Sequence, residues 1–214
     1  WSLLGSCDIE RATRLFWSRQ QIRSTMRDVA TMNEKAQAWL GNLLGWGQRR
    51  QAGDAEKLYA EAVRLARNPV FFDKYGVADD VDGRFDALSL IVTLVMRRLK
   101  SLDDDGKVLS QQLFDSMFAD MDLSLREMGA GDIGVSKRVR AMAEAFMGRL
   151  ESYVDAIDNR DEKSFSSALK RNLFRGNETV DPMANGLVEY LFALVKQIDN
   201  LPAEKVLAGK LDIN

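Results

Sequence analysis

The 214-residue sequence contains no histidine, and its only cysteine is Cys7. Without histidine the chain lacks the usual general base at neutral pH, the imidazole of serine and cysteine triads, and the commonest transition-metal ligand. A single cysteine cannot form an internal disulfide or a CxxC motif, which fits a reducing compartment. These absences predict a protein that is not an enzyme and that has no catalytic residues, no cofactor and no bound metal.

Long apolar runs and a net basic charge are also missing. The longest run, LSLIVTLVM at residues 88–96, is less than half of the ~20 residues that cross a bilayer, so it predicts a buried helix. The N-terminal sequence lacks the features of a secretory signal, which predicts that the protein stays in the compartment where it is made. With 30 Lys and Arg against 32 Asp and Glu, we expect no specific DNA binding.

Apolar residues recur at intervals of three and four, which is typical of helices that bury one face. We expect helices over about 54–67, 83–101, 107–128, from the glycines near 130 to 158, and over 162–174 and 182–200. Asp54, Asp161 and the pair Asp181–Pro182 are expected to cap helix N-termini. Because no segment alternates like a strand, the predicted class is all-α, a single irregular helical bundle with an N-terminal extension.

The chain divides into three predicted parts. Residues 1–31 form an extension that is either not native or disordered, residues 32–53 form a short amphipathic segment, and residues 54–214 form the helical domain. The amphipathic segment suggests contact with a membrane interface, where indole rings lie at headgroup depth and arginines meet anionic lipid. Packing on the domain or on a neighbour is the alternative. The membrane-interface candidates are Trp39, Leu43, Trp46, Arg49 and Arg50.

Gly129, Gly131 and Gly134 have the G-x-G-x-x-G spacing of a dinucleotide-binding loop. That motif requires a buried strand before the glycines, whereas the preceding residues have helical periodicity. The glycines are therefore predicted to join two helices, with Gly129 as a left-handed cap and Asp132 or Ser136 capping the next helix.

Methionines are concentrated on the two helices that flank these glycines. Their flexible side chains suit a surface that receives varied apolar partners, although core filling is the simpler interpretation. The second of these helices also has a basic side with Lys137, Arg138, Arg140 and Arg149, which is either solvated or in contact with phosphates or acidic protein.

The phrases MDLSLREMGAGDIGVSKRV, MAEAFMGR and ALKRNLFRG, with the region before them, resemble the ubiquinol-cytochrome c chaperone family over roughly residues 57–176. The chain would be a bacterial homologue of the mitochondrial assembly factor. It departs from the family where proline is common at Ala78 and Ser136, histidine at Ile91, and an aromatic residue at Met147.

The resemblance implies an assembly chaperone that binds newly synthesised cytochrome b during biogenesis of ubiquinol-cytochrome c reductase. It also implies contact with the ribosome, the membrane surface and a second assembly factor, and a cytoplasmic location, peripheral at the inner membrane, or the matrix side in a mitochondrion. A peripheral membrane adaptor that recruits protein partners without holding a client is the alternative.

Two sets of residues are expected to form the client site. The apolar groove is predicted to contain Met117, Met121, Met128, Met142, Phe146 and Met147. A second set is either a polar rim around that groove or a set of structural ion pairs: Asp82, Arg84, Asp86, Arg126, Glu127 and Asp132.

Overall fold

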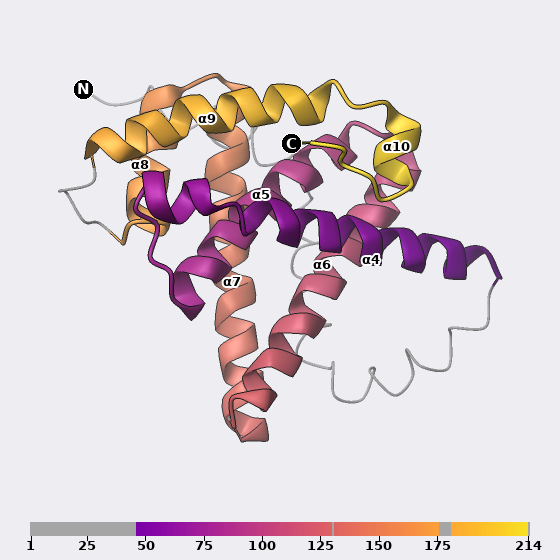
Figure 1. Cartoon of the computed structure of the whole chain (residues 1–214). Helices are drawn as coiled ribbons and strands as arrows, with labels where there is room; N and C mark the ends of the chain where they lie inside the picture. The colour runs from indigo at the N-terminus through magenta and orange to yellow at the C-terminus, as the bar shows by residue number, and fades with distance from the viewer. Residues whose placement is uncertain (1–45, 130, 176–180, 214) are drawn as a thin grey trace, which may run out of the picture. The chain divides into compact units, whose positions relative to one another are not determined.

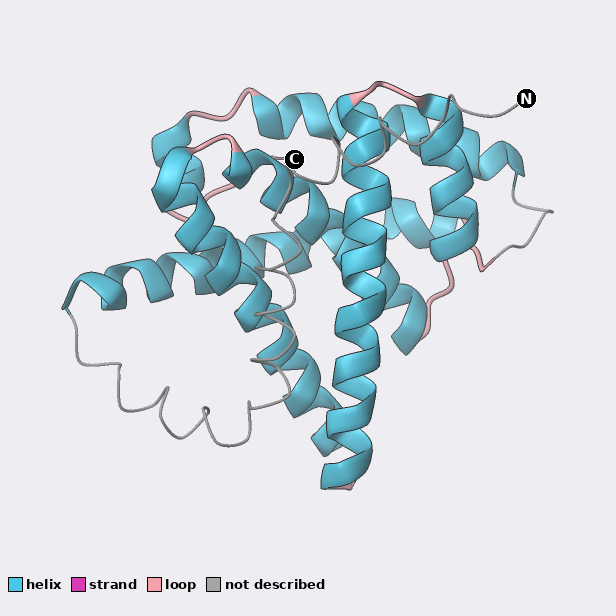
Figure 2. Cartoon of the chain, turned by 180° about the vertical axis from the view of Figure 1, so that it is seen from behind, coloured by secondary structure: helices cyan, strands magenta, loops and turns pink. Residues whose placement is uncertain are grey.

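The computed structural model of the chain describes residues 46–129, 131–175 and 181–213 (Figure 1). Within them every regular element is helical, which confirms the all-α prediction for this part of the chain (Figure 2). The elements are α4 (Trp46–Ala66), η1 (Val70–Lys74, one turn of π-helix), α5 (Val81–Lys100), α6 (Asp103–Glu127), α7 (Asp132–Asp158), α8 (Glu162–Asn172), α9 (Asp181–Asp199) and α10 (Ala203–Leu207).

The predicted extension, residues 1–31, lies outside the described residues, as do residues 32–45 of the predicted amphipathic segment. For residues 46–52, 132–133 and 181–182 the structure describes the backbone alone. None of the helices in the described part is both long and apolar enough to cross a membrane.

α5 is the central helix and packs against α6, α7 and α9. Most of its residues are buried, including the whole apolar run from Leu88 to Met96, so the prediction of a buried helix there is confirmed. Its N-terminus is capped by Asp80, whose carboxylate accepts a hydrogen bond from the Gly83 amide at 2.7 Å. A Cβ at Gly83 would collide with the Ala78 carbonyl oxygen, so only glycine allows this close approach.

Two predicted helix starts are wrong. α4 begins at Trp46, so Asp54 lies inside the helix and its side chain accepts from Lys57 Nζ at 2.7 Å instead of capping. A glycine within a helix costs only about 1 kcal/mol, so Gly53 weakens this helix without ending it. α6 begins at Asp103 rather than near Lys107, because three aspartates in its first turn interact favourably with the helix dipole.

The predicted cap at Asp161 is confirmed, since its carboxylate accepts from the Ser164 amide at 2.9 Å. α6 and α7 pack against each other and are joined by a short turn, so they form an antiparallel hairpin; both views show them converging at that turn (Figures 1 and 2).

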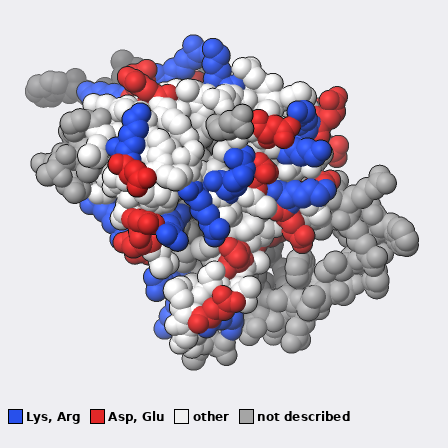
Figure 3. All heavy atoms as spheres, in the orientation of Figure 1, with Lys and Arg blue, Asp and Glu red and all other residues white. Residues whose placement is uncertain are grey.

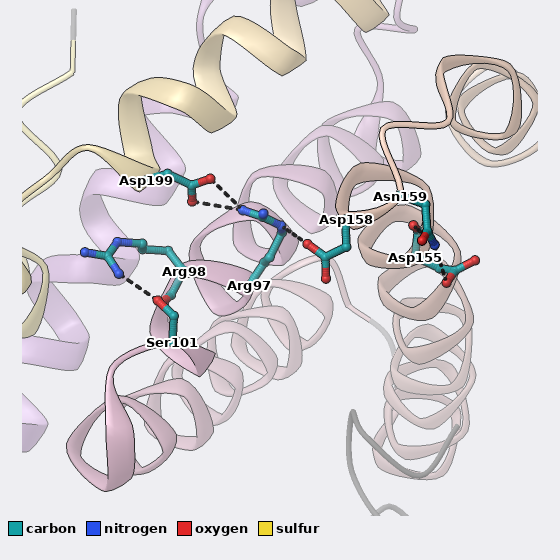
Figure 4. A network of polar contacts seen from close by, with 7 residues as sticks. All are labelled: Arg97, Arg98, Ser101, Asp155, Asp158, Asn159 and Asp199. Carbon is teal, nitrogen blue, oxygen red and sulfur yellow. Dashed lines mark hydrogen bonds and ion pairs between the residues drawn. The ribbon is translucent and has the colours of Figure 1, made fainter. Parts of the chain in front are cut away.

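The C-terminal ends of three helices are held together by Arg97 at the end of α5 (Figure 4). Its Nε lies 2.7 Å from Asp158 of α7, and its Nη1 lies 2.9 Å from Asp199 of α9. Carboxylates are unfavourable at helix C-termini, where the dipole is negative, so the guanidinium offsets two such charges at once. Arg97 therefore fixes the orientation of α7 and α9 relative to α5.

Candidate functional site

The glycine turn between α6 and α7 connects helices and cannot be a dinucleotide-binding loop, because α6 precedes it where a strand would be required. Gly129 has φ +84°, and its amide donates to the Arg126 carbonyl at 2.9 Å, which confirms the predicted left-handed cap. The N-cap of α7 is Gly131, so neither Asp132 nor Ser136 occupies the predicted capping position.

The six residues predicted to form the apolar groove do not lie on one exposed surface. Met117 and Phe146 are fully buried, and Phe146 packs between Phe114 and Phe118 with ring centroids 5.6 and 5.9 Å away. Met121, Met142 and Met147 are half-buried, while Met128 is 56% exposed at the end of α6. Met117 and Phe146 are therefore part of the core between α6 and α7, and only the other four predicted groove residues are exposed to solvent.

Exposed apolar side chains are concentrated on α6. Of the five large hydrophobic residues that are exposed in the described part of the chain, three lie on α6 or at its end: Val108 (43%), Leu123 (55%) and Met128 (56%). Leu123 was not predicted as a site residue because it lies outside the buried apolar stripe that includes Leu125. The feature that could have identified it is an apolar side chain on the polar face of an amphipathic helix.

Asp82 and Asp86, one turn apart on α5, form an ion-pair cluster with α7 and with Arg175, three residues after the end of α8. Asp86 is 3% exposed, and its carboxylate lies 2.9 Å from Arg149 of α7. Arg175 lies 3.6 Å from Asp86 and 3.2 Å from Asp82, and Arg138 of α7 lies 3.6 Å from Asp82. The cluster therefore links three parts of the chain.

Burial raises the pKa of the Asp86 carboxyl to about 6, although the neighbouring charges of Arg149 and Arg175 oppose that shift. The Arg149 guanidinium lies over the Phe85 ring, 5.6 Å from its centroid. Nε and Nη1 of Arg149 are buried without a hydrogen-bond partner, as is Oδ2 of Asp86. A charged pair this poorly hydrated is costly to disturb, which favours a structural role for Asp86.

The other residues of the predicted rim form local contacts. Arg84 pairs with Asp79 at 2.7 Å on the surface. Arg126 pairs with Asp122, one turn earlier on α6, at 2.6 Å, and Glu127 is exposed. The Asp132 side chain lies outside the description. The described members of this set thus form no single ring of charge: Asp82 and Asp86 share one cluster, and Arg84 and Arg126 pair elsewhere.

The membrane-interface candidates fall at the edge of the described residues. Trp39 and Leu43 lie outside them, and Trp46, Arg49 and Arg50 lie in the first turns of α4, where the backbone alone is described. In the described part of the chain no group of three or more histidine, cysteine, aspartate or glutamate side chains could hold a metal ion.

Comparison with known proteins gives consistent matches. The family described as ubiquinol-cytochrome C chaperone matches residues 73–213, a range that contains α5 to α10. The chain is 27% identical over 154 residues to ubiquinol-cytochrome-c reductase complex assembly factor 1 of Xenopus laevis, covering 72% of this chain and 76% of that protein. The crystal structure of the Cbp3 homolog from Brucella abortus is similar with a TM-score of 0.69 and 32% identity, over 79% of this chain and 93% of that one.

Proposed function

The chain belongs to the ubiquinol-cytochrome C chaperone family, and from this premise we propose that it is an assembly chaperone of ubiquinol-cytochrome c reductase that holds newly made cytochrome b. The family name describes a chaperone, which implies a non-catalytic role. We propose in addition that the client is cytochrome b and that it binds to the exposed apolar side chains of α6 and of the turn that follows α6.

The observation that carries the proposal is the exposure of Leu123 and Met128 within five residues of each other. A membrane protein such as cytochrome b presents apolar segments before it is inserted, and a factor that holds them needs apolar surface of its own. Full burial of a leucine or methionine side chain contributes about 1.5–3 kcal/mol. Leu123 and Met128 are just over half exposed, so covering each contributes about half of that, and a few such contacts support reversible binding. The half-buried Met121, Met142 and Met147 could extend this surface, since methionine adapts to irregular partners.

The ribosome, a second assembly factor and the membrane surface are the further partners that we propose, with a location peripheral to the inner membrane on its cytoplasmic or matrix side. The amphipathic segment at residues 32–53 would supply the membrane contact. If that contact were the only function, the chain would be a peripheral adaptor and would bind lipid or mature subunits without capturing cytochrome b.

Capture of cytochrome b during its synthesis tests the proposal. The variant Leu123→Asp/Met128→Asp should retain its thermal midpoint, because both side chains are exposed, but should recover at least tenfold less nascent cytochrome b. Met183→Asp is the matched control, since Met183 is 44% exposed on α9 and outside the proposed surface. Equal recovery by the double variant and the control, with both proteins folded, would place the client elsewhere.

A further inference from the structure

The exposed apolar residues of α6 lie on the most acidic helix in the described part of the chain. α6 carries seven acidic side chains against two basic ones. The whole chain has 32 acidic and 30 basic residues, so the rest of the molecule is slightly basic. Along the lower part of α6, Figure 3 shows acidic side chains with uncharged surface between them.

The spacing of these residues puts acidic and apolar groups on the same face. Asp104, Val108, Asp115, Ala119 and Asp122 follow one another at intervals of three, four or seven, which aligns them along one side of a helix. The opposite side of α6 is buried against α5 and α7. Next to this face, Leu123 lies one turn from both Ala119 and Glu127. Leu123 is thus an apolar side chain within an acidic surface.

Two carboxylates of α6 accept hydrogen bonds from neutral groups rather than from cations. Asp115 accepts from the neutral amide of Gln111 at 2.9 Å, and Asp120 accepts from the Tyr59 hydroxyl at 2.7 Å. The two basic residues of α6 each pair with an acidic residue one turn away: Lys107 with Asp104 at 2.8 Å, and Arg126 with Asp122 at 2.6 Å. With seven acidic and two basic side chains on α6, the surface around Leu123 is negative overall.

We propose that the outer face of α6 recognises an apolar protein segment flanked by lysine or arginine. This inference rests on the proposed function and names the chemistry of the client segment that binds there. The loops of membrane proteins that stay on the side of synthesis are rich in lysine and arginine next to their apolar spans. Such a segment offers apolar groups to Leu123, and offers positive charge to Asp115 and Glu127.

The charge of the neighbouring helix, α7, determines the orientation of the bound segment on α6. α7 carries the exposed basic residues Lys137, Arg138 and Arg140 in its second and third turns, so the part of α7 near the hairpin turn is more basic than α6. A basic flank is attracted to α6 and repelled by these turns of α7, which orients the segment. An anionic membrane is disfavoured as the occupant, because the carboxylates of α6 would repel it.

The test compares two peptides that share one apolar core of ten residues, flanked by three lysines in one and by three glutamates in the other. Fluorescence anisotropy with the full chain at low salt should show about fivefold or tighter binding of the lysine-flanked peptide, since two surface pairs contribute this much. Asp115→Lys/Glu127→Lys should remove or invert the preference. Glu151→Lys/Glu189→Lys makes the same charge change at exposed sites on α7 and α9 and should retain it.

Equal binding of the two peptides, an equal loss in both double variants, or tighter binding to vesicles of anionic lipid than to the lysine-flanked peptide would overturn the inference. Thermal unfolding of each variant checks that it is folded. The two proposals fail separately. If cytochrome b is captured and α6 charge reversal has no effect, only the recognition of basic flanks is wrong; if peptide preference persists without capture, only the client is wrong.

Discussion

Replacement of Arg149 by methionine should destabilise the chain strongly at pH 7 and much less at pH 5. The substitution keeps an apolar side chain over Phe85 but leaves the carboxylate of Asp86, 3% exposed, without its nearest cation at 2.9 Å. Removing one partner of a buried pair costs about 3 kcal/mol. In a domain of this size each kcal/mol lowers the thermal midpoint by about 2–4 °C, so a loss of about 6–12 °C is expected.

The pH dependence follows from the pKa of Asp86, which burial raises to about 6 from the model-peptide value of 3.8. The folded state therefore holds the proton more tightly than the unfolded state. The stabilisation from protonation is complete below pH 3.8 and is lost as pH rises through about 6. For the unmodified chain this contributes about 1 kcal/mol between pH 5 and pH 7. Without Arg149 the pKa rises further, so acidification should restore more of the lost stability.

Urea denaturation at pH 5, 6 and 7 measures these differences, and Asp86→Asn is the control because it removes the titrating group. The double variant Arg149→Met/Asp86→Asn should regain most of the free energy of unfolding that Arg149→Met loses at pH 7. Its free energy of unfolding should also lack the change with pH that Asp86 causes. If Arg149→Met is equally destabilised at all three pH values and Asp86→Asn fails to rescue it, lost packing rather than charge explains the effect. The cluster would then have no electrostatic role in holding α5 to α7.

Gly106→Ala should lower the free energy of unfolding by about 2 kcal/mol, because a Cβ there would collide with the preceding backbone, whereas Gly148→Ala, with open space around it, should raise it by about 0.5–1 kcal/mol. Arg97→Met should cost about 1–2 kcal/mol in urea denaturation by breaking ion pairs to two helices, and less in 1 M salt. Tyr59→Phe should cost about 1 kcal/mol in the same assay through its lost hydrogen bond to α6. Trp46→Ala should reduce flotation with anionic liposomes if the amphipathic segment binds lipid, and an unchanged result would argue against that contact.

The helical class and most element positions could be predicted from the sequence because burial of one face leaves a period of 3.6. The length of the apolar run at residues 88–96 predicted a buried helix, and the glycine between two periodic segments predicted the cap at Gly129. The start of α4 could not be predicted, since a capping-competent residue such as Asp54 also occurs inside helices. The local sequence is compatible with Asp54 as an N-cap and with Asp54 inside the helix, and tertiary packing determines which of the two forms.

The candidate site was predicted less completely, for a physical reason. Periodicity identifies the buried stripe of a helix but not how deep each residue lies beneath its neighbours, so Met117 and Phe146 could not be distinguished from the exposed Met128. Ion pairs between residues far apart in the sequence also could not be predicted. Asp86 and Arg175, for example, come together only in the folded chain. The family was identified from long motifs, and the comparisons confirm that resemblance.

The claim that this chain holds newly made cytochrome b through α6 is tested most directly by photocrosslinking during synthesis of cytochrome b. A photoreactive amino acid is placed at Leu123 in one protein and at Met183 in another, and the adducts are identified by mass spectrometry. The account predicts a cytochrome b adduct from Leu123, mapped to an apolar segment beside lysine or arginine, and none above background from Met183. Adducts from Leu123 that contain only mature reductase subunits or lipid, or equal cytochrome b adducts from both positions, would contradict it.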